Sequence, residues 1–333
     1  MKPPAHFRSH SWRLAWLPLA LAACTAPAPE SHATLVRDLQ PAALNGRPLK
    51  VTTTANIVGD LARVIGAERV QVTDLMGPGV DPHLFKASAR DVRTLQGADL
   101  VLYGGLHLEG KMVELLEKNR KATAVTQNVP KERLLYPQGG FGGVEGLADP
   151  HVWFDVDLWK TAAETTRDAL SAADPAGQER YAQNAAAYLT QLDALDREVA
   201  TLMNRVPKEQ RVLVTAHDAF GYFGKRYGVE VRGVQGVSTA SEAGTRNVQE
   251  LAQFVASRRI PALFVESSVP QRTVQAVISA VRAQGQTVQI GGQLFSDALG
   301  SAGTPEATYL GMVRHNVQTI SSALAPRAQE QTP

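Results

Sequence analysis

One long segment of helical periodicity near the middle of the chain constrains the fold more than any other feature of the sequence. Between Pro175 and Val206, apolar side chains recur in alternating steps of four and three residues, which is the spacing of one face of an α-helix. Asp174 can cap the start of this helix, and proline suits its first position. Such a helix would be about 48 Å long, so it either joins a coiled coil or runs along the back of two packed lobes. The apolar positions are Tyr181, Ala185, Tyr188, Leu192, Leu195, Val199, Leu202 and Val206.

On both sides of this segment, short β-branched runs alternate with amphipathic helical patterns. An example of the helical pattern is 56–66, where Gly66 suits the C-terminal cap. This alternation is typical of parallel sheets covered by helices. We therefore predict an α/β fold of two lobes, each with a parallel β-sheet flanked by helices, joined by the long helix along their back. The β-branched runs are 49–55, 69–75, 98–104 and 122–125 in the first half, and 211–216, 229–234, 261–267 and 286–292 in the second.

These patterns also predict the domain boundaries. We expect an N-terminal α/β lobe over residues 48–174, the linker helix over 175–207, a C-terminal α/β lobe over 208–325 and a short tail over 326–333. About 290 residues with 44% hydrophobic composition are enough for one large or two medium domains.

The N-terminus reads as an export signal. Residues 1–23 combine basic residues with an apolar run too short to cross a membrane, and the only cysteine, Cys24, follows. Residues 21–24 resemble the bacterial lipobox, in which the cysteine becomes the acylated first residue. The alternative is an ordinary signal peptide followed by a spare thiol. With residues 24–47 as a tether, we predict a lipoprotein anchored through Cys24 on the extracytoplasmic side of the cell membrane or in the periplasm.

Removing this signal changes the charge of the chain. It takes away three basic residues and no acidic one, so the formal net charge falls from +2 to −1. With neither a basic patch nor a strongly acidic tail, the sequence argues against a nucleic-acid partner. If Cys24 carries the lipid, no thiol remains for a disulfide, and the core must hold the exported fold together.

The tripeptide Asp-Pro-His occurs twice, and its histidines are two of four candidate metal ligands. His83, His217 and Asp297 each follow a predicted strand, and His151 precedes a predicted helix. Taken singly, such a histidine is more often a hydrogen-bonded loop residue than a ligand. However, ligands of open parallel sheets bind beyond the carboxyl ends of the strands, and two facing lobes would bring the four side chains together. Imidazole and carboxylate groups suit Zn²⁺ and other divalent transition metals.

Other polar and aromatic residues receive lesser roles. Asp155 and Glu266 are candidate acceptors for the second ring N–H of a metal-bound imidazole. We expect His107 to approach the site without binding the metal, and His315 to be structural or exposed. The aromatic side chains expected to form an apolar wall around the site are Trp153, Phe154 and Phe220.

The motifs DPHLF, DPHVWF, TAHDAFGYF, STASEAG and LFSDALG, in this order around a long central helix, resemble those of a known family. They are similar to the zinc- and manganese-binding solute receptors of bacterial ABC importers, the TroA-like family with a helical backbone between two lobes. The resemblance runs from about residue 51 to residue 324. It implies that Zn²⁺ or Mn²⁺ is captured between the lobes by His83, His151, His217 and Asp297. It also implies delivery to a membrane permease with its ATPase, and we expect a monomer.

The choice between the two metals depends on His217. Manganese receptors of this family commonly have glutamate at this position, and three imidazoles with one carboxylate form a softer ligand set that favours zinc. Many zinc-specific members carry a histidine- and acid-rich loop shortly before DPHVW. Here residues 137–150 contain no histidine and only two acids, Glu145 and Asp149. Receptors with three histidines and one aspartate include carriers of either metal, so we expect a slight preference for zinc.

The competing hypothesis is a secreted zinc-dependent hydrolase. Catalytic zinc keeps three protein ligands and one open position, whereas four protein ligands close the tetrahedron. The sequence contains neither HExxH nor GxSxG. We therefore predict a binding protein and not an enzyme. A cell-adhesion role is compatible with a surface lipoprotein, but the sequence gives it no separate support.

Overall fold

The first lobe is built on a four-stranded parallel sheet. Its strands are ordered β2-β1-β3-β4. The computed structural model describes residues 1, 36, 38–137 and 145–325. The predicted signal peptide, Cys24, the C-terminal tail and most of the predicted tether lie outside the described residues. The strands are β1 (Leu49–Ala55), β2 (Val70–Met76), β3 (Leu100–Tyr103) and β4 (Ala122–Ala124).

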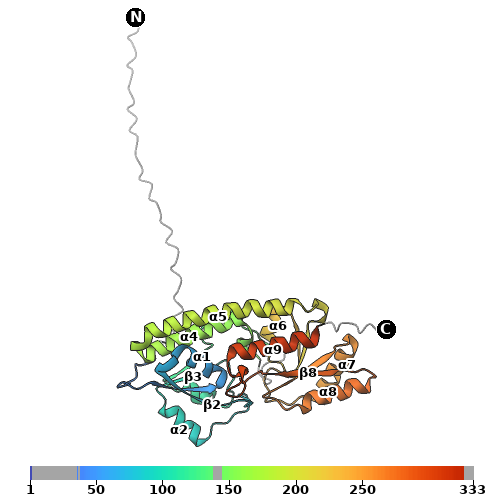
Figure 1. Cartoon of the computed structure of the whole chain (residues 1–333), viewed down its shortest axis with the longest axis horizontal. Helices are drawn as coiled ribbons and strands as arrows, with labels where there is room; N and C mark the ends of the chain where they lie inside the picture. Colours follow the sequence, from blue (N-terminus) through green and yellow to red (C-terminus); the bar gives the residue numbers. More distant parts are fainter. Residues whose placement is uncertain (2–35, 37, 138–144, 326–333) are drawn as a thin grey trace. The chain divides into compact units, whose positions relative to one another are not determined.

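Helices cover both faces of this sheet. Figure 1 shows α2 on the side opposite to α1, α4 and α5. Strand β3 explains the two layers, because Leu100 and Leu102 belong to the main hydrophobic core while Val101 packs in a separate cluster with Leu95 and Leu116. The helices of this lobe are α1 (Asn56–Gly66), α2 (Ala89–Gly97), α3 (Val113–Glu117) and α4 (Val156–Ala173).

The second lobe contains two parallel strand pairs, β5–β6 and β7–β8, and β5 also lies against β7. Its own hydrophobic core lies between these strands and helices α7 and α8. The strands are β5 (Val212–His217), β6 (Glu230–Gln235), β7 (Ala262–Glu266) and β8 (Gln289–Leu294). The helices are α6 (Gly221–Tyr227), α7 (Thr245–Arg258), α8 (Arg272–Ala283) and α9 (Tyr309–Leu324).

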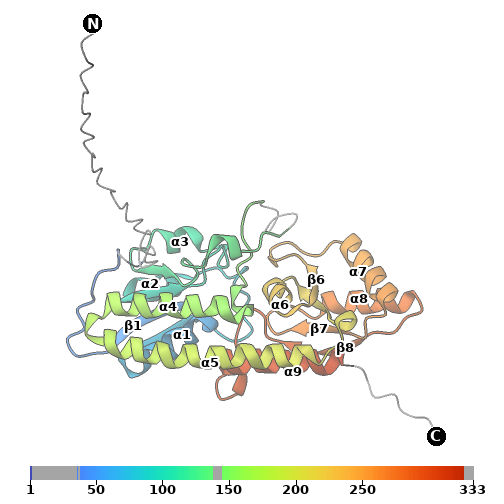
Figure 2. The same cartoon turned by 90° about the horizontal axis from the view of Figure 1, so that it is seen from above.

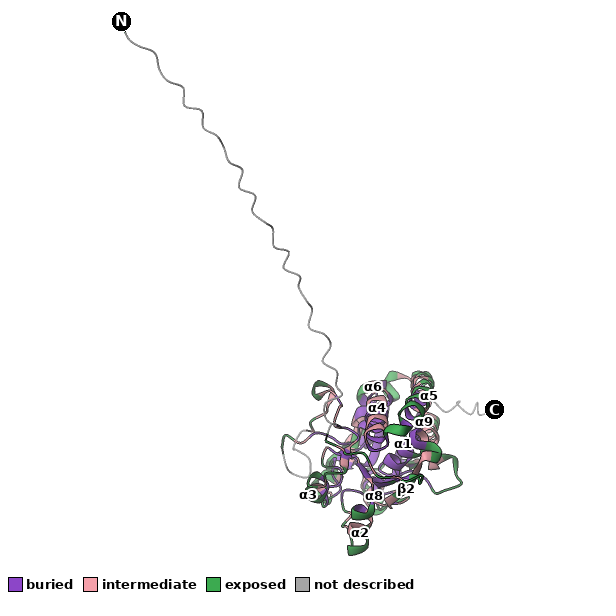
Figure 3. Ribbon diagram, turned by 90° about the vertical axis from the view of Figure 1, so that its left-hand side faces the viewer, coloured by how far each residue is buried: buried purple, intermediate pink, exposed green. Residues whose placement is uncertain are grey.

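The long helix α5 (Gln178–Asn204) joins the two lobes, as predicted from its periodicity. It runs beside α4 and α1 in the first lobe and beside α9 in the second (Figures 1 and 2). Hydrogen bonds hold it at both ends, from Asn184 to the Ile65 carbonyl and from Arg226 to Asp196. Figure 3 shows buried residues gathered between these helices and exposed residues on their outer surfaces. The α/β fold with two lobes and one long helix is therefore confirmed.

The start of this helix differs from the sequence-based prediction in detail. A 3-10 turn, Pro175–Gly177, precedes α5, and Asp174 makes no capping hydrogen bond. Its carboxylate instead accepts hydrogen bonds from Tyr181 (2.6 Å) and Arg69 (2.6 Å). Asp174 thus ties the helix to the first lobe. Within the described part of the chain, no helix is both long and apolar enough to span a membrane.

The end of α1 shows a second difference. Gly66 is the last residue of the helix, but the left-handed residue that follows the helix is Ala67, with φ of 45°. A Cβ atom on Gly66 would lie 2.4 Å from both methyl carbons of Val70. Glycine is therefore needed here because β2 starts so close to the helix end, and not to adopt a left-handed conformation.

Strand β6 approaches β5 most closely beside His217. A Cβ atom on Gly233 would lie 2.4 Å from the Asp218 amide nitrogen and 2.7 Å from the His217 carbonyl carbon. We expect Gly233→Ala to reduce the free energy of unfolding by roughly 1–3 kcal/mol, because the backbone must move to make room. Thermal unfolding of the purified protein would measure it. The control is Gly97→Ala, where no atom lies within 4 Å of the added carbon; equal effects of the two substitutions would contradict the prediction.

Candidate metal centre

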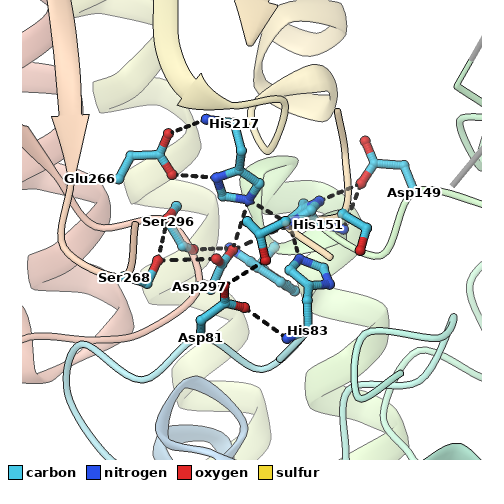
Figure 4. A network of polar contacts seen from close by, with 12 residues as sticks. Asp81, His83, Asp149, His151, His217, Glu266, Ser268, Ser296 and Asp297 are labelled. Carbon is cyan, nitrogen blue, oxygen red and sulfur yellow. Dashed lines mark hydrogen bonds and ion pairs between the residues drawn. The ribbon is translucent and has the colours of Figure 1, made fainter. Parts of the chain in front are cut away.

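Four side chains from both lobes meet at one buried point. His83 lies in the loop after β2, and His151 directly precedes the 3-10 turn Val152–Phe154. His217 is the last residue of β5, and Asp297 follows β8. One potential ligand atom from each residue lies within 4.8 Å of all the others, and all four residues are buried. Figure 4 shows the side chains converging from separate segments. The structure thus brings together all four residues that the sequence nominated.

The ring nitrogens point at one another across the site. The His151 Nε2 atom is 3.3 Å from the His83 Nε2 atom and 3.4 Å from the His217 Nε2 atom. The Asp297 Oδ1 atom is 3.3 Å from His151 Nε2 and 3.4 Å from His217 Nε2. Three nitrogen donors and one carboxylate oxygen therefore surround a common centre, and this ligand set matches a tetrahedral transition-metal site.

The two Asp-Pro-His tripeptides form the same local turn. In the first, Asp81 Oδ1 accepts a hydrogen bond from the His83 main-chain N–H at 2.9 Å. In the second, Asp149 Oδ1 accepts from the His151 main-chain N–H, also at 2.9 Å. An aspartate that binds the backbone two residues later is an Asx turn, and the proline between the two residues fixes φ. The repeat is thus a rigid device that presents a histidine from a loop.

Carboxylates orient two of the three imidazoles. Asp149 Oδ1 is 2.7 Å from the His151 Nδ1 atom. Glu266 accepts from His217 twice, at the main-chain N–H (2.9 Å) and at ring Nδ1 (2.5 Å). An acceptor at Nδ1 places the proton there and leaves Nε2 available as a ligand. The sequence-based prediction named Glu266 for such a contact but missed Asp149. The position of Asp149 two residues before His151 could have indicated its contact with this ring.

Asp155, the other nominated acceptor, lies elsewhere. Its Oδ1 atom accepts from the main-chain N–H groups of Asp157 and Leu158 and so caps helix α4. The carboxylate also pairs with Arg133 (3.0 Å) and Arg226 (3.3 Å). The prediction that Asp155 accepts a hydrogen bond from a ring of the site is therefore wrong. An aspartate immediately before a helix satisfies the free N–H groups of the first turn, and here that local role prevails.

The Asp297 carboxylate has one satisfied and one unsatisfied oxygen. Its Oδ2 atom accepts from Ser268 Oγ at 3.1 Å, and Ser268 is in turn 2.9 Å from Ser296 Oγ. Its Oδ1 atom is buried and has no hydrogen-bond partner among the described residues. The distances from this Oδ1 atom to the Nε2 atoms of His151 and His217 are longer than the roughly 2.7–2.9 Å of a charge-assisted hydrogen bond. A buried carboxylate oxygen aimed at three imidazoles in this way fits a cation.

Burial and neighbouring charges shift the pKa values in opposite directions. Burial lowers the pKa of His83 to about 3. Burial also acts to lower the pKa of His151, but the carboxylates of Asp149 and Asp297 outweigh it and raise that pKa to about 9. The pKa of His217 is raised well above its usual value in the same way, and the imidazoles hold the pKa of Asp297 well below its own. Metal binding at neutral pH must therefore displace a proton from the His151 and His217 rings, whereas the His83 ring is already neutral.

The aromatic residues occupy the predicted wall. The Trp153 ring packs edge-on against the His151 ring, with centroids 5.1 Å apart. The Phe154 ring stacks on the Phe220 ring at 4.2 Å. All three aromatic side chains are buried, so they exclude water from the site.

Two further histidines lie outside the site. His107 is exposed and has a positive φ of 62°. The His315 Nε2 atom is 3.0 Å from the Gln293 carbonyl oxygen on the outer surface, consistent with a structural or exposed role.

Comparison with known proteins identifies the family of the chain. Residues 51–323 match the family described as the zinc-uptake complex component A, periplasmic. The chain is 50% identical over 288 residues to the zinc-binding protein TroA of Treponema pallidum (strain Nichols), which covers 85% of this chain and 91% of that protein. It is 48% identical over 280 residues to the manganese-binding lipoprotein MntA of Bacillus subtilis (strain 168), covering 83% and 90%. The solved structure of the periplasmic zinc-binding protein TroA from Treponema pallidum has a TM-score of 0.80 at 49% identity, covering 84% of this chain and all of that chain.

The raised pKa of His151 depends on the carboxylate at its Nδ1 atom. We expect Asp149→Asn to lower this pKa in the metal-free protein from about 9, because burial then opposes protonation and only Asp297 still compensates for it. An NMR titration of the ring nitrogens would measure the pKa of His151 in both proteins. The control Asp155→Asn removes a carboxylate that pairs with arginines instead, and an equal shift in both variants would argue against the assignment.

Proposed function

Because this chain belongs to the family of the periplasmic zinc-uptake complex component A, we propose that it is an extracytoplasmic solute-binding protein for a divalent transition metal. It captures Zn²⁺ or Mn²⁺ between its lobes and delivers the ion to an ABC permease that works with an ATPase. The observation that carries this proposal is the buried convergence of three imidazoles and one carboxylate within 4.8 Å.

We assign the metal ligands as His83 and His151 from the first lobe, and His217 and Asp297 from the second. The lobes are taken as residues 48–174 and 208–325, with residues 175–207 as the linker. Glu266 and Asp149 hold the imidazoles through Nδ1. Removing such a partner typically reduces metal affinity by about 10- to 100-fold.

The relatives do not decide between the two metals, because one is named for zinc and the other for manganese at almost equal identity. The ligand set favours zinc, since imidazole nitrogen is a softer donor than carboxylate oxygen. The rival hypothesis of a secreted zinc hydrolase receives no support from these relatives, which are named as binding proteins. Four protein ligands also leave no open position for a catalytic water on zinc.

Anchoring to the membrane is a further part of the proposal. Cys24 would carry the lipid and residues from Thr25 onward would form the tether, which agrees with the word lipoprotein in the name of the Bacillus subtilis relative. The Ala42 main-chain N–H donates to the Ala173 carbonyl at 2.8 Å, which supports a tether that ends against the first lobe. We expect the mature receptor to act as a monomer.

Two substitutions test the anchoring. Cys24→Ala should move the protein from the membrane fraction to the soluble extracytoplasmic fraction, because the acylated residue is lost. Cys24→Ser has nearly the same size and should behave in the same way. Mass spectrometry of the mature N-terminal peptide would show the lipid directly, and an unmodified Cys24 in the wild-type protein would rule the anchor out.

The identity of the cargo is tested by competition between zinc and manganese on the metal-stripped protein. We expect zinc to bind more tightly, and His217→Glu to narrow the difference, because it replaces a nitrogen donor by a hard oxygen donor. The matched control is His107→Glu, at an exposed position outside the site. If neither metal binds the wild-type protein, the proposed function is wrong. If manganese binds as tightly as zinc, the ligand set does not select the cargo.

A further inference from the structure

The two Asp-Pro-His turns differ in the use of their aspartates. Asp149 places one oxygen on both the main chain and the ring of His151. Asp81 binds only the main chain of His83 with Oδ1, and its Oδ2 atom accepts a hydrogen bond of 2.6 Å from Thr239 Oγ1. Thr239 belongs to the second lobe, in the loop 236–244 between β6 and α7. The aspartate that fixes His83 is therefore itself held by the opposite lobe.

The other ligand segments are held across the lobes by the main chain or by large buried side chains. The Trp153 indole N–H donates to the Ser296 carbonyl at 2.9 Å, one residue before Asp297. On the other side of Asp297, Asn56 makes two hydrogen bonds with the Leu299 main chain.

Beside His151, the Tyr222 hydroxyl donates to the Asp149 carbonyl at 2.8 Å and accepts from the Leu135 N–H at 3.1 Å. Leu135 is partly buried, but Tyr222 and Asp149 lie in the buried interior, where breaking a hydrogen bond leaves a polar group unsatisfied.

The Thr239 side chain is also buried, but its partner Asp81 lies closer to the surface. Leu84 directly follows His83 and is 49% exposed. A pocket of about 480 Å³ opens beside it, and its lining includes Leu84, Thr239, Glu242 and Pro270. Asp81 is only partly buried. If the Thr239 hydroxyl withdraws, water can reach the carboxylate, so this contact is easier to break than the buried ones.

The loop 236–244 is fastened mainly to itself and to its own lobe. The Ala240 N–H donates to Ser238 Oγ at 3.2 Å, and the Gln235 side chain donates to the Ser241 carbonyl at 3.3 Å. This loop faces the pocket rather than the core on one side. Thr239 therefore has open space beside it into which its side chain can turn.

We propose that the hydrogen bond between Thr239 and Asp81 closes the site over His83 and sets the rate at which the bound metal leaves. This inference rests on the proposed metal-binding function and adds a route of release to it. Breaking the bond loosens the Asp81 turn that holds the main chain of His83. The segments that carry the other three ligands keep their own contacts across the lobes. Thr239 is thus a positioning residue that acts through Asp81.

The test is the rate of zinc loss from the metal-loaded, full-length protein into an excess of chelator, followed by stopped flow. We expect Thr239→Val to raise the dissociation rate about tenfold, the factor expected for one hydrogen bond to a charged group. Thr239→Ser keeps the hydroxyl and should stay within about twofold of the wild type, by the same reasoning. The control Thr273→Val changes a threonine of the same pocket that has no contact with Asp81, and the rate should not change.

A double-substitution cycle separates this role from general destabilisation. In an Asp81→Ala background, Thr239→Val should have no further effect on the dissociation rate, because its partner is already missing. Thermal unfolding of metal-free Thr239→Val should show that the variant is still fully folded at the temperature of the rate measurement. The inference would be overturned if the two substitutions together raised the dissociation rate by the product of their separate effects. It would also be overturned if Thr239→Val lost zinc at the wild-type rate. Either result would leave the proposed metal binding intact. A wild-type protein that takes up no zinc would instead overturn the proposed function.

Discussion

The balance of charge inside a buried site is the constraint on which the rest of the structure depends. Asp297 is fully buried and lies beside two imidazoles whose outer nitrogens face Asp149 and Glu266. An isolated buried carboxylate is costly, and partners at fixed positions must compensate for it. Each group in this network therefore requires the others, and the network joins residues from four separate segments of the chain. The folding of both lobes is coupled to the assembly of this one site.

The long helix and the contacts beneath it supply the fixed frame. Helix α5 packs against both lobes, and Asn56 and Trp153 connect the first lobe to the main chain on either side of Asp297. With so many buried contacts between the lobes, a large hinge motion would leave many polar groups unsatisfied. A local movement of surface loops costs less, and this difference points to exchange of the metal at the exposed end near His83.

The two Asp-Pro-His turns show how one motif acquires two roles. Both fix a histidine backbone through an Asx turn. The second turn is buried, and Asp149 also holds the ring of its own histidine. The first turn lies near the surface, and the free oxygen of Asp81 receives Thr239 from the other lobe. The surroundings of each turn, and not the tripeptide itself, decide whether it acts as a permanent support or as a contact that can open.

Features with a local period or a local motif could be predicted from the amino-acid sequence. Alternating apolar steps predicted α5, β-branched runs predicted the eight strands, and the positions of His83, His151, His217 and Asp297 after or beside strands nominated the site. Only the tertiary structure decided which acid serves which group. Asp149 holds an imidazole, whereas Asp155 caps a helix and Asp174 binds a tyrosine and an arginine. Periodicity records which face of an element is buried, but it does not choose between the near and distant partners open to a carboxylate. Asp174 binds Arg69, 105 residues away, and Asp155 pairs with Arg226 of the other lobe, so these contacts depend on how the chain packs.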